Sequence, residues 1–250
     1  MSRLAWGKEN RLARLRTEQG AYLLLALDHG LSAPVAGLED LGRWVELASR
    51  HRLSGVVLHR GMVARSPLLG RTSLVLQTFG LPDAGASRLG RVPVATVEDA
   101  LRLSADAIAV QLCVDGADRQ HVVEKVAAMV SAADAAGLPV LFMVTVDDPA
   151  RVDAGRLAFA IRACTELGAD LIKVPLPRPD LPPDGVAALK RAILAAPPVL
   201  AAGGPRSADL DAQLAAAVAL GFRGACIGRN VFQAARPELV LGLLHERFAR

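Results

Sequence analysis

Short apolar runs rich in valine, isoleucine and leucine alternate along the chain with longer segments of helical periodicity. Nearly continuous hydrophobicity over a few residues is typical of parallel strands that are covered on both faces. Eight such runs predict strands at Tyr22–Leu27, Gly55–Leu58, Ser73–Gln77, Ala107–Leu112, Pro139–Val144, Asp170–Val174, Pro198–Ala202 and Gly224–Ile227.

Helical patterns fill most of the intervals between these runs. Thr96 and Asp99 have the spacing of an N-terminal capping box. Gly137, Gly168 and Gly221 stand just beyond three helical segments, where C-terminal caps occur. The predicted helices are Leu38–Arg50, Thr96–Ser104, Arg119–Ala136, Val152–Leu167, Asp184–Ala195, Ser207–Leu220 and Val231–Phe248, with an initial helix at Glu9–Gln19 and a short helix or loop at Arg60–Gly70.

This alternation predicts the fold class. Eight strand–helix repeats in 250 residues fit a single (β/α)₈ TIM barrel over residues 1–250, preceded by an extra N-terminal helix. A doubly wound open sheet is the alternative. It would favour a Gly-x-Gly-x-x-Gly turn after a strand, and the sequence has none.

Composition narrows the class of protein. Hydrophobic residues make up 52% and charged residues 22%, as in globular proteins. The formal net charge of +4 is spread over arginines in helical segments, and aromatics are only 4%, so we expect a phosphorylated small molecule and no nucleic acid as partner. No apolar run reaches the ~18–20 residues that span a bilayer. The N-terminus lacks the apolar core of a signal peptide, so we expect a cytoplasmic protein without a membrane partner.

Lysine is rare in this chain, which carries its positive charge mainly on arginine. It occurs at positions 8, 125, 173 and 190, and only Lys173 lies inside an apolar strand, between Ile172 and Val174. Unlike arginine, lysine can lose its proton when desolvated, and the free amine can attack a carbonyl to form an imine. The alternative is a structural lysine at the barrel rim, or one paired with a carboxylate such as Asp28. We favour imine formation because an unpaired buried lysine is costly.

Polar residues follow several strands at the ends where barrel enzymes place their chemistry. Asp28 and His29 follow the first strand, and His59 follows the second. Asp28 can move protons near an imine, or it can cap a turn. We expect His29 to contact the substrate, and His59 either to act in catalysis or to make a structural hydrogen bond.

Glycines follow the last two strands, as Gly203-Gly204 and as Gly228 before Arg229. Small residues let backbone N–H groups approach an anion, and barrel enzymes often bind phosphate in these two loops. Predicted helices begin just beyond, at Ser207 and Val231, and Arg229 can add a charge-assisted hydrogen bond. The two loops together predict a phosphate site.

This ordered set of residues resembles the archaeal-type class I fructose-bisphosphate aldolase family, also described as DhnA or DeoC/LacD-like aldolases. The family includes enzymes similar to 2-amino-3,7-dideoxy-D-threo-hept-6-ulosonate synthase. The resemblance implies that Lys173 forms the imine, that Asp28 is an acid/base residue, and that the glycines and Arg229 bind phosphate. The matching segments are Leu27–Gly30, Val57–Gly61, Ala169–Pro175, Ala201–Pro205 and Gly228–Gln233.

The chain departs from the family pattern at the end of the fifth strand. The resemblance implies a tyrosine acid/base there, but this sequence has Thr145. A threonine hydroxyl is too weak an acid to replace a phenol, although it can position a water. The chain's single tyrosine, Tyr22, lies six residues before Asp28 on the same inward face, roughly 20 Å down the barrel, so we expect it to pack. Asp147, Asp148, His29 and His59 are candidates for the proton shuttle.

These observations favour a class I aldolase-type lyase. It would act on a phosphorylated ketose, or condense a dihydroxyacetone-phosphate-like donor with an aldehyde. Imine chemistry uses the iminium as its electron sink, and the cysteines have no metal spacing, so we expect no cofactor or metal. We also expect a homo-oligomer and a reshaped pocket rim in the proline-rich loop 175–183. The alternatives are an imine-forming isomerase, dehydratase or acyl-transfer enzyme, or a catalytically impaired phosphate-binding homologue, against which Lys173 and Asp28 argue.

Overall fold

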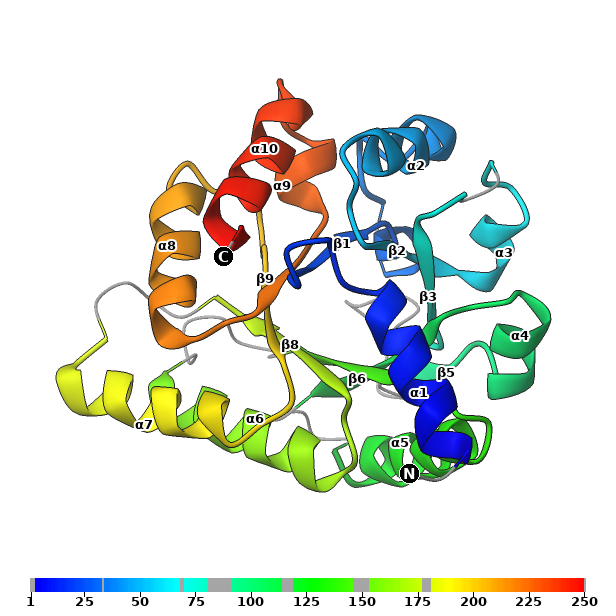
Figure 1. Ribbon diagram of the computed structural model, residues 1–250, viewed down its shortest axis with the longest axis horizontal. Coiled ribbons are helices and arrows are strands. Elements are labelled where there is room, and N and C mark those ends of the chain that lie inside the picture. The colour runs from blue at the N-terminus through cyan, green and yellow to red at the C-terminus, as the bar shows by residue number, and fades with distance from the viewer. Residues whose placement is uncertain are drawn as a thin grey trace.

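Eight parallel strands close into a barrel in the computed structural model, and helices surround it (Figure 1). The structure describes residues 3–32, 34–67, 70–80, 91–113, 119–145, 153–176 and 181–249. The strands neighbour one another in the order β1-β10-β9-β8-β7-β6-β3-β2. Their bounds are β1 Tyr22–Ala26, β2 Gly55–His59, β3 Ser73–Gln77, β6 Ala107–Cys113, β7 Val140–Thr145, β8 Leu171–Pro175, β9 Val199–Ala202 and β10 Gly224–Ile227. The predicted TIM barrel is confirmed, with every strand within a residue or two of its predicted limits.

A second, antiparallel pairing was not predicted from the sequence. Strand β4, Phe79–Gly80, pairs with β5, Val92–Pro93, beyond the end of β3. Each strand has only two residues, so neither carries a periodic pattern that could be recognised.

The helices follow the strands around the barrel. Two predicted signals are confirmed: Thr96 and Asp99 make both bonds of the capping box, and the three predicted C-terminal glycines have left-handed φ angles of 63°, 90° and 101°. The helices are α1 Arg3–Arg14, α2 Leu41–Arg50, α3 Arg60–Val63, α4 Val97–Arg102, α5 Arg119–Ala135, α6 Ala154–Glu166, α7 Pro183–Leu194, α8 Leu210–Leu220, α9 Arg229–Phe232 and α10 Pro237–Phe248, with a 3₁₀ turn η1 at His29–Leu31.

Some helix boundaries differ from the predictions for physical reasons. Helix α2 begins three residues late because Asp40 caps it, accepting a hydrogen bond from the Arg43 N–H. The predicted helix 231–248 is two helices, since Pro237 cannot donate a backbone hydrogen bond and instead occupies the first turn of α10. The initial helix runs from Arg3 to Arg14 and not over 9–19, because its position is fixed by contacts with the barrel.

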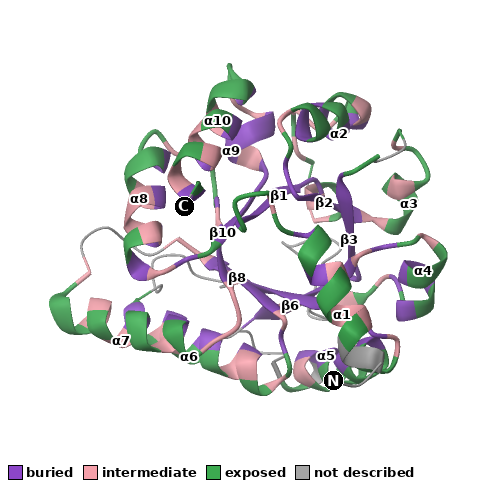
Figure 2. Ribbon diagram, in the orientation of Figure 1, coloured by how far each residue is buried: buried purple, intermediate pink, exposed green. Residues whose placement is uncertain are grey.

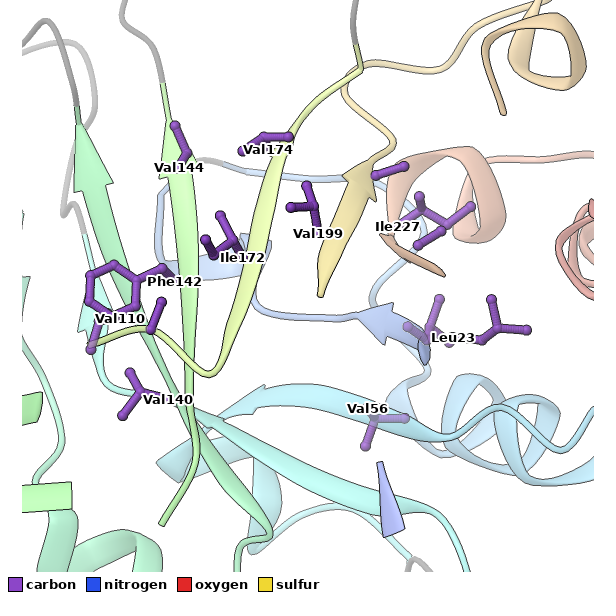
Figure 3. Close-up of a cluster of buried hydrophobic side chains, with 14 of the residues drawn as sticks. Leu23, Val56, Val110, Val140, Phe142, Val144, Ile172, Val174, Val199 and Ile227 are labelled. Carbon is purple, nitrogen blue, oxygen red and sulfur yellow. The ribbon is translucent and has the colours of Figure 1, made fainter. Parts of the chain in front are cut away.

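The hydrophobic core has two layers that the strands separate. Outward-facing side chains such as Val56, Phe142 and Ile172 fill the space between the barrel and the helices (Figure 3). Inward-facing side chains, including Leu24, Leu141 and Leu200, fill the barrel itself. The strands are accordingly almost entirely buried, while the helices expose their outer faces (Figure 2).

Helix α1 closes the end of the barrel where the strands begin. Leu12 and Leu15 pack into the inner layer beside Tyr22, whose hydroxyl accepts a 2.7 Å hydrogen bond from Arg16 Nε. The packing role predicted for Tyr22 is therefore confirmed.

Ion pairs hold α1 across the strand starts. Lys8 Nζ lies 2.8 Å from Asp170 Oδ2, just before β8, and Arg14 Nε lies 2.6 Å from Asp106 Oδ1, just before β6. Within the described residues, α1 therefore covers this end of the barrel and leaves the opposite end, where the strands finish, open. Among the helices in the described ranges, none combines the length and hydropathy needed to cross a bilayer.

Candidate active site

A cavity of about 660 Å³ opens at the carboxyl ends of the strands. Nearly all of the predicted site residues line it, although they come from loops and strands far apart in the sequence. They are Asp28, His29, Thr145, Lys173, Gly203, Gly204, Gly228 and Arg229. His59 is the exception.

Lys173 lies on the inward face of β8, in register with Met143 of β7 and Leu200 of β9. Its sequence neighbours Ile172 and Val174 point outward into the hydrophobic layer, so the alternation of the strand turns the amine into the cavity (Figure 3). The amine is half-buried and hydrogen-bonds the thiol of Cys226 on β10. Burial raises the pKa of that thiol, which keeps Cys226 neutral beside the lysine.

Asp28 is a buried carboxylate at the end of β1. It does not cap the turn that follows it; its Oδ2 instead accepts a 2.8 Å hydrogen bond from Gln77 Nε2. Burial raises the pKa of Asp28, but the charge of Lys173, the neighbouring His29 and the Gln77 hydrogen bond outweigh burial, so the pKa lies below its ordinary value. Asp28 is therefore ionised at neutral pH and can accept a proton.

His29 is a neutral imidazole against the same cavity. Burial is the largest influence on it and lowers its pKa to about 4, although the Asp28 carboxylate opposes this. Its ring meets Phe232 edge-on, with ring centroids 5.4 Å apart. Its buried Nδ1 lies 3.8 Å from Asp28 Oδ1 and has no hydrogen-bond partner within the described residues.

His59 ends β2 and does not line the cavity. It pairs in register with Gln77 of β3, and its charge affects the pKa of Asp28. Its Nδ1 is also buried without a partner among the described residues. The structure therefore places His59 near Asp28 but not at the cavity wall, and its role in proton transfer stays a prediction. Alternation along a strand predicts which way a side chain points, not whether it reaches the ligand.

Thr145 ends β7, one inward position beyond Met143. Its Oγ1 is buried and lacks a partner in the part of the chain that the structure describes. Thr145 lines the cavity, although its hydroxyl oxygen is itself shielded from solvent, at the position where the family pattern would place a phenol. Asp147 and Asp148 lie outside the described residues. So do residues 177–180 of the predicted proline-rich rim, although Pro175 and Leu176 do line the cavity.

The loops after β9 and β10 pack too closely for larger residues. A Cβ on Gly203 would lie 2.8 Å from Ile227 Cγ2, and one on Gly228 would lie 2.3 Å from the Ala26 carbonyl oxygen. Gly204 has a left-handed φ of 59°, which glycine adopts without strain. The guanidinium Nε of Arg229 is buried and has no partner among the described residues. This combination of backbone and cation suits an anion.

The helix starts beside this site differ from the predicted ones, Ser207 and Val231. Helix α8 begins at Leu210 and not at Ser207, and α9 has only four residues. The start of α8 is therefore displaced from the loop, whereas α9 begins at the cavity itself, with Gly228 as its N-cap. The features that suit an anion here are the close-packed glycine loops and the buried Arg229.

Three further polar residues of the site are recognisable at strand ends in the sequence, but the sequence assigned them no role. Gln77 holds Asp28, Gln111 lines the cavity from β6, and Asn230 is buried behind Gly203. Each falls at or next to a strand end, which was the available signal. Their roles depend on contacts between strands that are distant in sequence.

Similarity to known proteins agrees with this barrel and its site. The model of the DeoC/LacD family aldolases matches residues 22–234, from the first strand to just beyond α9. The chain belongs to the DeoC/LacD aldolase family. Members of this family are enzymes. The described part of this chain has no cluster of three or more histidine, cysteine, aspartate or glutamate side chains that could hold a metal.

Two curated relatives align along most of their length. The chain is 33% identical over 244 residues to 2-amino-4,5-dihydroxy-6-oxo-7-(phosphonooxy)heptanoate synthase of Streptomyces griseus, covering 91% of this chain and 85% of the relative. It is 28% identical over 248 residues to 2-amino-3,7-dideoxy-D-threo-hept-6-ulosonate synthase 1 of Archaeoglobus fulgidus, covering 96% and 90%. The crystal structure of an archaeal fructose 1,6-bisphosphate aldolase has a TM-score of 0.85 at 24% identity, covering 97% of this chain and 99% of the other, which establishes the shared fold.

Proposed function

We propose that this protein is a class I aldolase-type enzyme whose Lys173 forms an imine with the carbonyl carbon of a phosphorylated ketose or of a dihydroxyacetone-phosphate-like donor. The observation that carries the proposal is the position of the Lys173 amine. It faces the cavity from an otherwise apolar strand, with the ionised Asp28 close by and the anion-suited loops on the same wall.

The arrangement of Lys173 and Asp28 supports the proton transfers that imine formation needs. The neutral amine of Lys173 adds to the carbonyl carbon, giving a carbinolamine, and loss of water leaves an iminium. Asp28 relays one proton from the nitrogen to the alkoxide of the carbinolamine, and a second proton from solvent converts the hydroxyl into water as it leaves. In cleavage the iminium accepts the electron pair of the bond between the α and β carbons, and Asp28 takes the proton of the hydroxyl that becomes the aldehyde. In condensation Asp28 takes the proton of the α carbon–hydrogen bond, the resulting enamine attacks the aldehyde, and the aldehyde oxygen receives that proton. Water releases the product and restores the amine.

The two glycine loops and Arg229 are suited to the phosphate of this ligand. Binding energy from a remote phosphate can hold the carbonyl against Lys173 while the reacting bonds change. The Streptomyces griseus relative is a synthase of a phosphonooxy heptanoate, which supports a phosphorylated carbon chain as the ligand and condensation as the direction.

Reductive trapping tests the imine directly. Incubation with dihydroxyacetone phosphate and borohydride is expected to add the mass of the reduced donor, and peptide mapping is expected to assign the addition to Lys173. Lys173→Arg keeps the positive charge but cannot form an imine, so it is expected to lose the adduct. Lys190→Arg, at an exposed position on α7, is the matched control and is expected to retain it. An adduct on another lysine, or none with any phosphorylated carbonyl compound, would show that the proposal is wrong.

Thr145 favours a second candidate function. A reaction that never protonates an acceptor oxygen needs no phenol at the end of β7, so an imine-forming isomerase, dehydratase or acyl-transfer enzyme also suits this cavity. Product analysis separates the two. A changed carbon skeleton is expected for the aldolase-type reaction, and an intact skeleton for an isomerase or dehydratase. Ligand-induced thermal stabilisation without trapping would instead indicate an impaired phosphate-binding homologue.

We also propose that the protein is a homo-oligomer. Phe159 on α6, Leu194 on α7 and Leu239 on α10 expose 56%, 82% and 57% of their surfaces, and large exposed apolar side chains often mark contact surfaces. Light scattering coupled to size exclusion is expected to give a multiple of the chain mass. A monomer at micromolar concentration would contradict this.

A further inference from the structure

Asn230 is buried between the two glycine loops and satisfies three backbone groups of one of them. Its side chain is only 3% exposed. Nδ2 donates to the Gly203 carbonyl at 2.6 Å and to the Pro205 carbonyl at 3.2 Å, and Oδ1 accepts from the Ser207 N–H at 2.9 Å. Among uncharged side chains of this size, only an amide supplies two donor hydrogens and an acceptor together. One residue of α9 therefore fixes the path of the loop between β9 and α8.

These bonds determine where the loop presents its own donors. Every peptide bond in the described chain is trans, so the C=O and the following N–H point in opposite directions. Because the Gly203 and Pro205 carbonyls face Asn230, the N–H groups of Gly204 and Arg206 face the other way, toward the cavity that this loop lines. The Ser207 N–H is already used by Asn230.

The same contact explains why Gly203 has no side chain. A Cβ there would lie 2.9 Å from Asn230 Nδ2. Asn230 also directly follows Arg229, whose buried Nε has no partner in the described ranges. The loop donors and the cation are therefore held by consecutive residues of one short helix.

We propose that Asn230 is a positioning residue that orients the Gly204 and Arg206 N–H groups toward the phosphate of the ligand. This inference rests on the phosphate-binding role in the proposed function, but Asn230 itself does not touch the ligand. An aspartate at this position keeps the acceptor for Ser207, loses both donors, and places a negative charge against two carbonyl oxygens. The repulsion is expected to rotate the two peptides, so that the Gly204 and Arg206 N–H groups no longer point toward the cavity.

The test compares two ketones that differ only in the phosphate. The concentration needed for half-maximal borohydride trapping is measured for dihydroxyacetone phosphate and for dihydroxyacetone. In Asn230→Asp and Asn230→Ala, the preference for the phosphorylated ketone is expected to fall at least about tenfold, the order of one lost hydrogen bond to a charged group. The value for dihydroxyacetone is expected to stay within about twofold. Asn10→Asp, the same change at the chain's other asparagine on exposed α1, is expected to alter neither.

Each other outcome is decisive. An unchanged preference for the phosphorylated ketone in Asn230→Asp overturns the inference. An equal loss with both ketones, or failure of both variants to fold, also overturns it, because either result indicates a structural role alone. If the unmodified protein traps neither ketone, the proposed imine is wrong and stabilisation by inorganic phosphate becomes the readout. A rise in Tm that Asn230→Asp abolishes then supports the inference, and the absence of any rise overturns it.

Discussion

The amide nitrogen of Gln77 donates a 2.8 Å hydrogen bond to the carboxylate of Asp28. The other end of the same amide is also fixed, because Oε1 accepts a 3.1 Å hydrogen bond from the Phe79 N–H. Gln77 is fully buried on the inward face of β3. It therefore fixes the direction of the carboxylate that moves protons in the proposed reaction, and it contributes, after the charges of Lys173 and His29, to lowering the pKa of Asp28.

Gln77→Met keeps the length and volume of the side chain but removes the donor. The pKa of Asp28 is expected to rise toward its ordinary value, because one of the influences that lower it is lost. The acid limb of the pH–kcat profile is expected to shift to higher pH, and kcat is expected to fall on the order of tenfold, with little change in KM. Gln120→Met, on the exposed face of α5, is the matched control. An unshifted acid limb would show that Asp28 is held by other contacts.

Thr145→Val is expected to separate stability from activity. The hydroxyl is buried without a protein partner in the described part, so its removal is expected to raise the free energy of unfolding by about 1 kcal/mol. Turnover is expected to fall roughly tenfold, the order of one hydrogen bond to a reacting ligand. Thr78→Val is the control, because the Thr78 hydroxyl donates a 2.7 Å hydrogen bond to the Ala109 carbonyl and its loss is expected to destabilise the protein by about 1 kcal/mol. Urea denaturation and steady-state kinetics measure both effects, and equal destabilisation by the two variants would contradict the assignment.

His29 is expected to make stability depend on pH between about 4 and its ordinary value of 6.5. In this window the unfolded chain binds a proton at His29 and the folded protein does not, so stability falls as pH falls. The loss attributable to this side chain is on the order of 3 kcal/mol at most. His29→Gln is expected to lose less stability than the unmodified protein between pH 7 and pH 4, as measured by urea denaturation. His51→Gln, outside the cavity, is expected to keep the original slope, and a His29→Gln slope equal to it would disprove the assignment.

Lys8→Met is expected to weaken the fold without affecting the reaction. Asp170 has a side chain only 15% exposed, and burial already raises its pKa although Lys8 opposes this. Without Lys8 the carboxylate has lost its compensating charge, and the free energy of unfolding is expected to fall by about 2 kcal/mol at pH 7. The deficit is expected to shrink as pH falls, because protonated Asp170 needs no partner.

Two comparisons test this account of the pair. Lys125→Met at an exposed site on α5 is the control for charge removal, and adding Asp170→Asn to Lys8→Met is expected to recover part of the loss. A change in kcat larger than about twofold in Lys8→Met would contradict the separation between the closed end of the barrel and the cavity.

Sequence periodicity predicted the barrel because strands buried on both faces need continuous apolar runs. The same logic located much of the site. Lys173 interrupts such a run, and Asp28, Thr145 and the glycines fall where runs end. These features can be recognised locally in the sequence. Closure of the barrel then brings the strand ends together, independently of the individual side-chain contacts.

The unpredicted features depend on contacts between distant segments. Gln77 reaches Asp28, 49 residues away, and Asn230 reaches Gly203, 27 residues away. The limits of α1 are set partly by Lys8 and Arg14, whose partners precede β8 and β6. His59 is the opposite case. Its position at a strand end predicted a cavity residue, but its side chain does not line the cavity.

Helix α1 closes one end of the barrel, and this determines the order in which ligands bind and leave. Lys173 is in register with Met143, and Thr145 lies two residues nearer the open mouth, about 7 Å farther out. A molecule bonded to Lys173 has no exit behind it, because Leu12 and Leu15 fill that space. In the proposed condensation the donor must therefore enter before any partner that occupies the space beside Thr145, and in cleavage the fragment bonded to Lys173 must leave last.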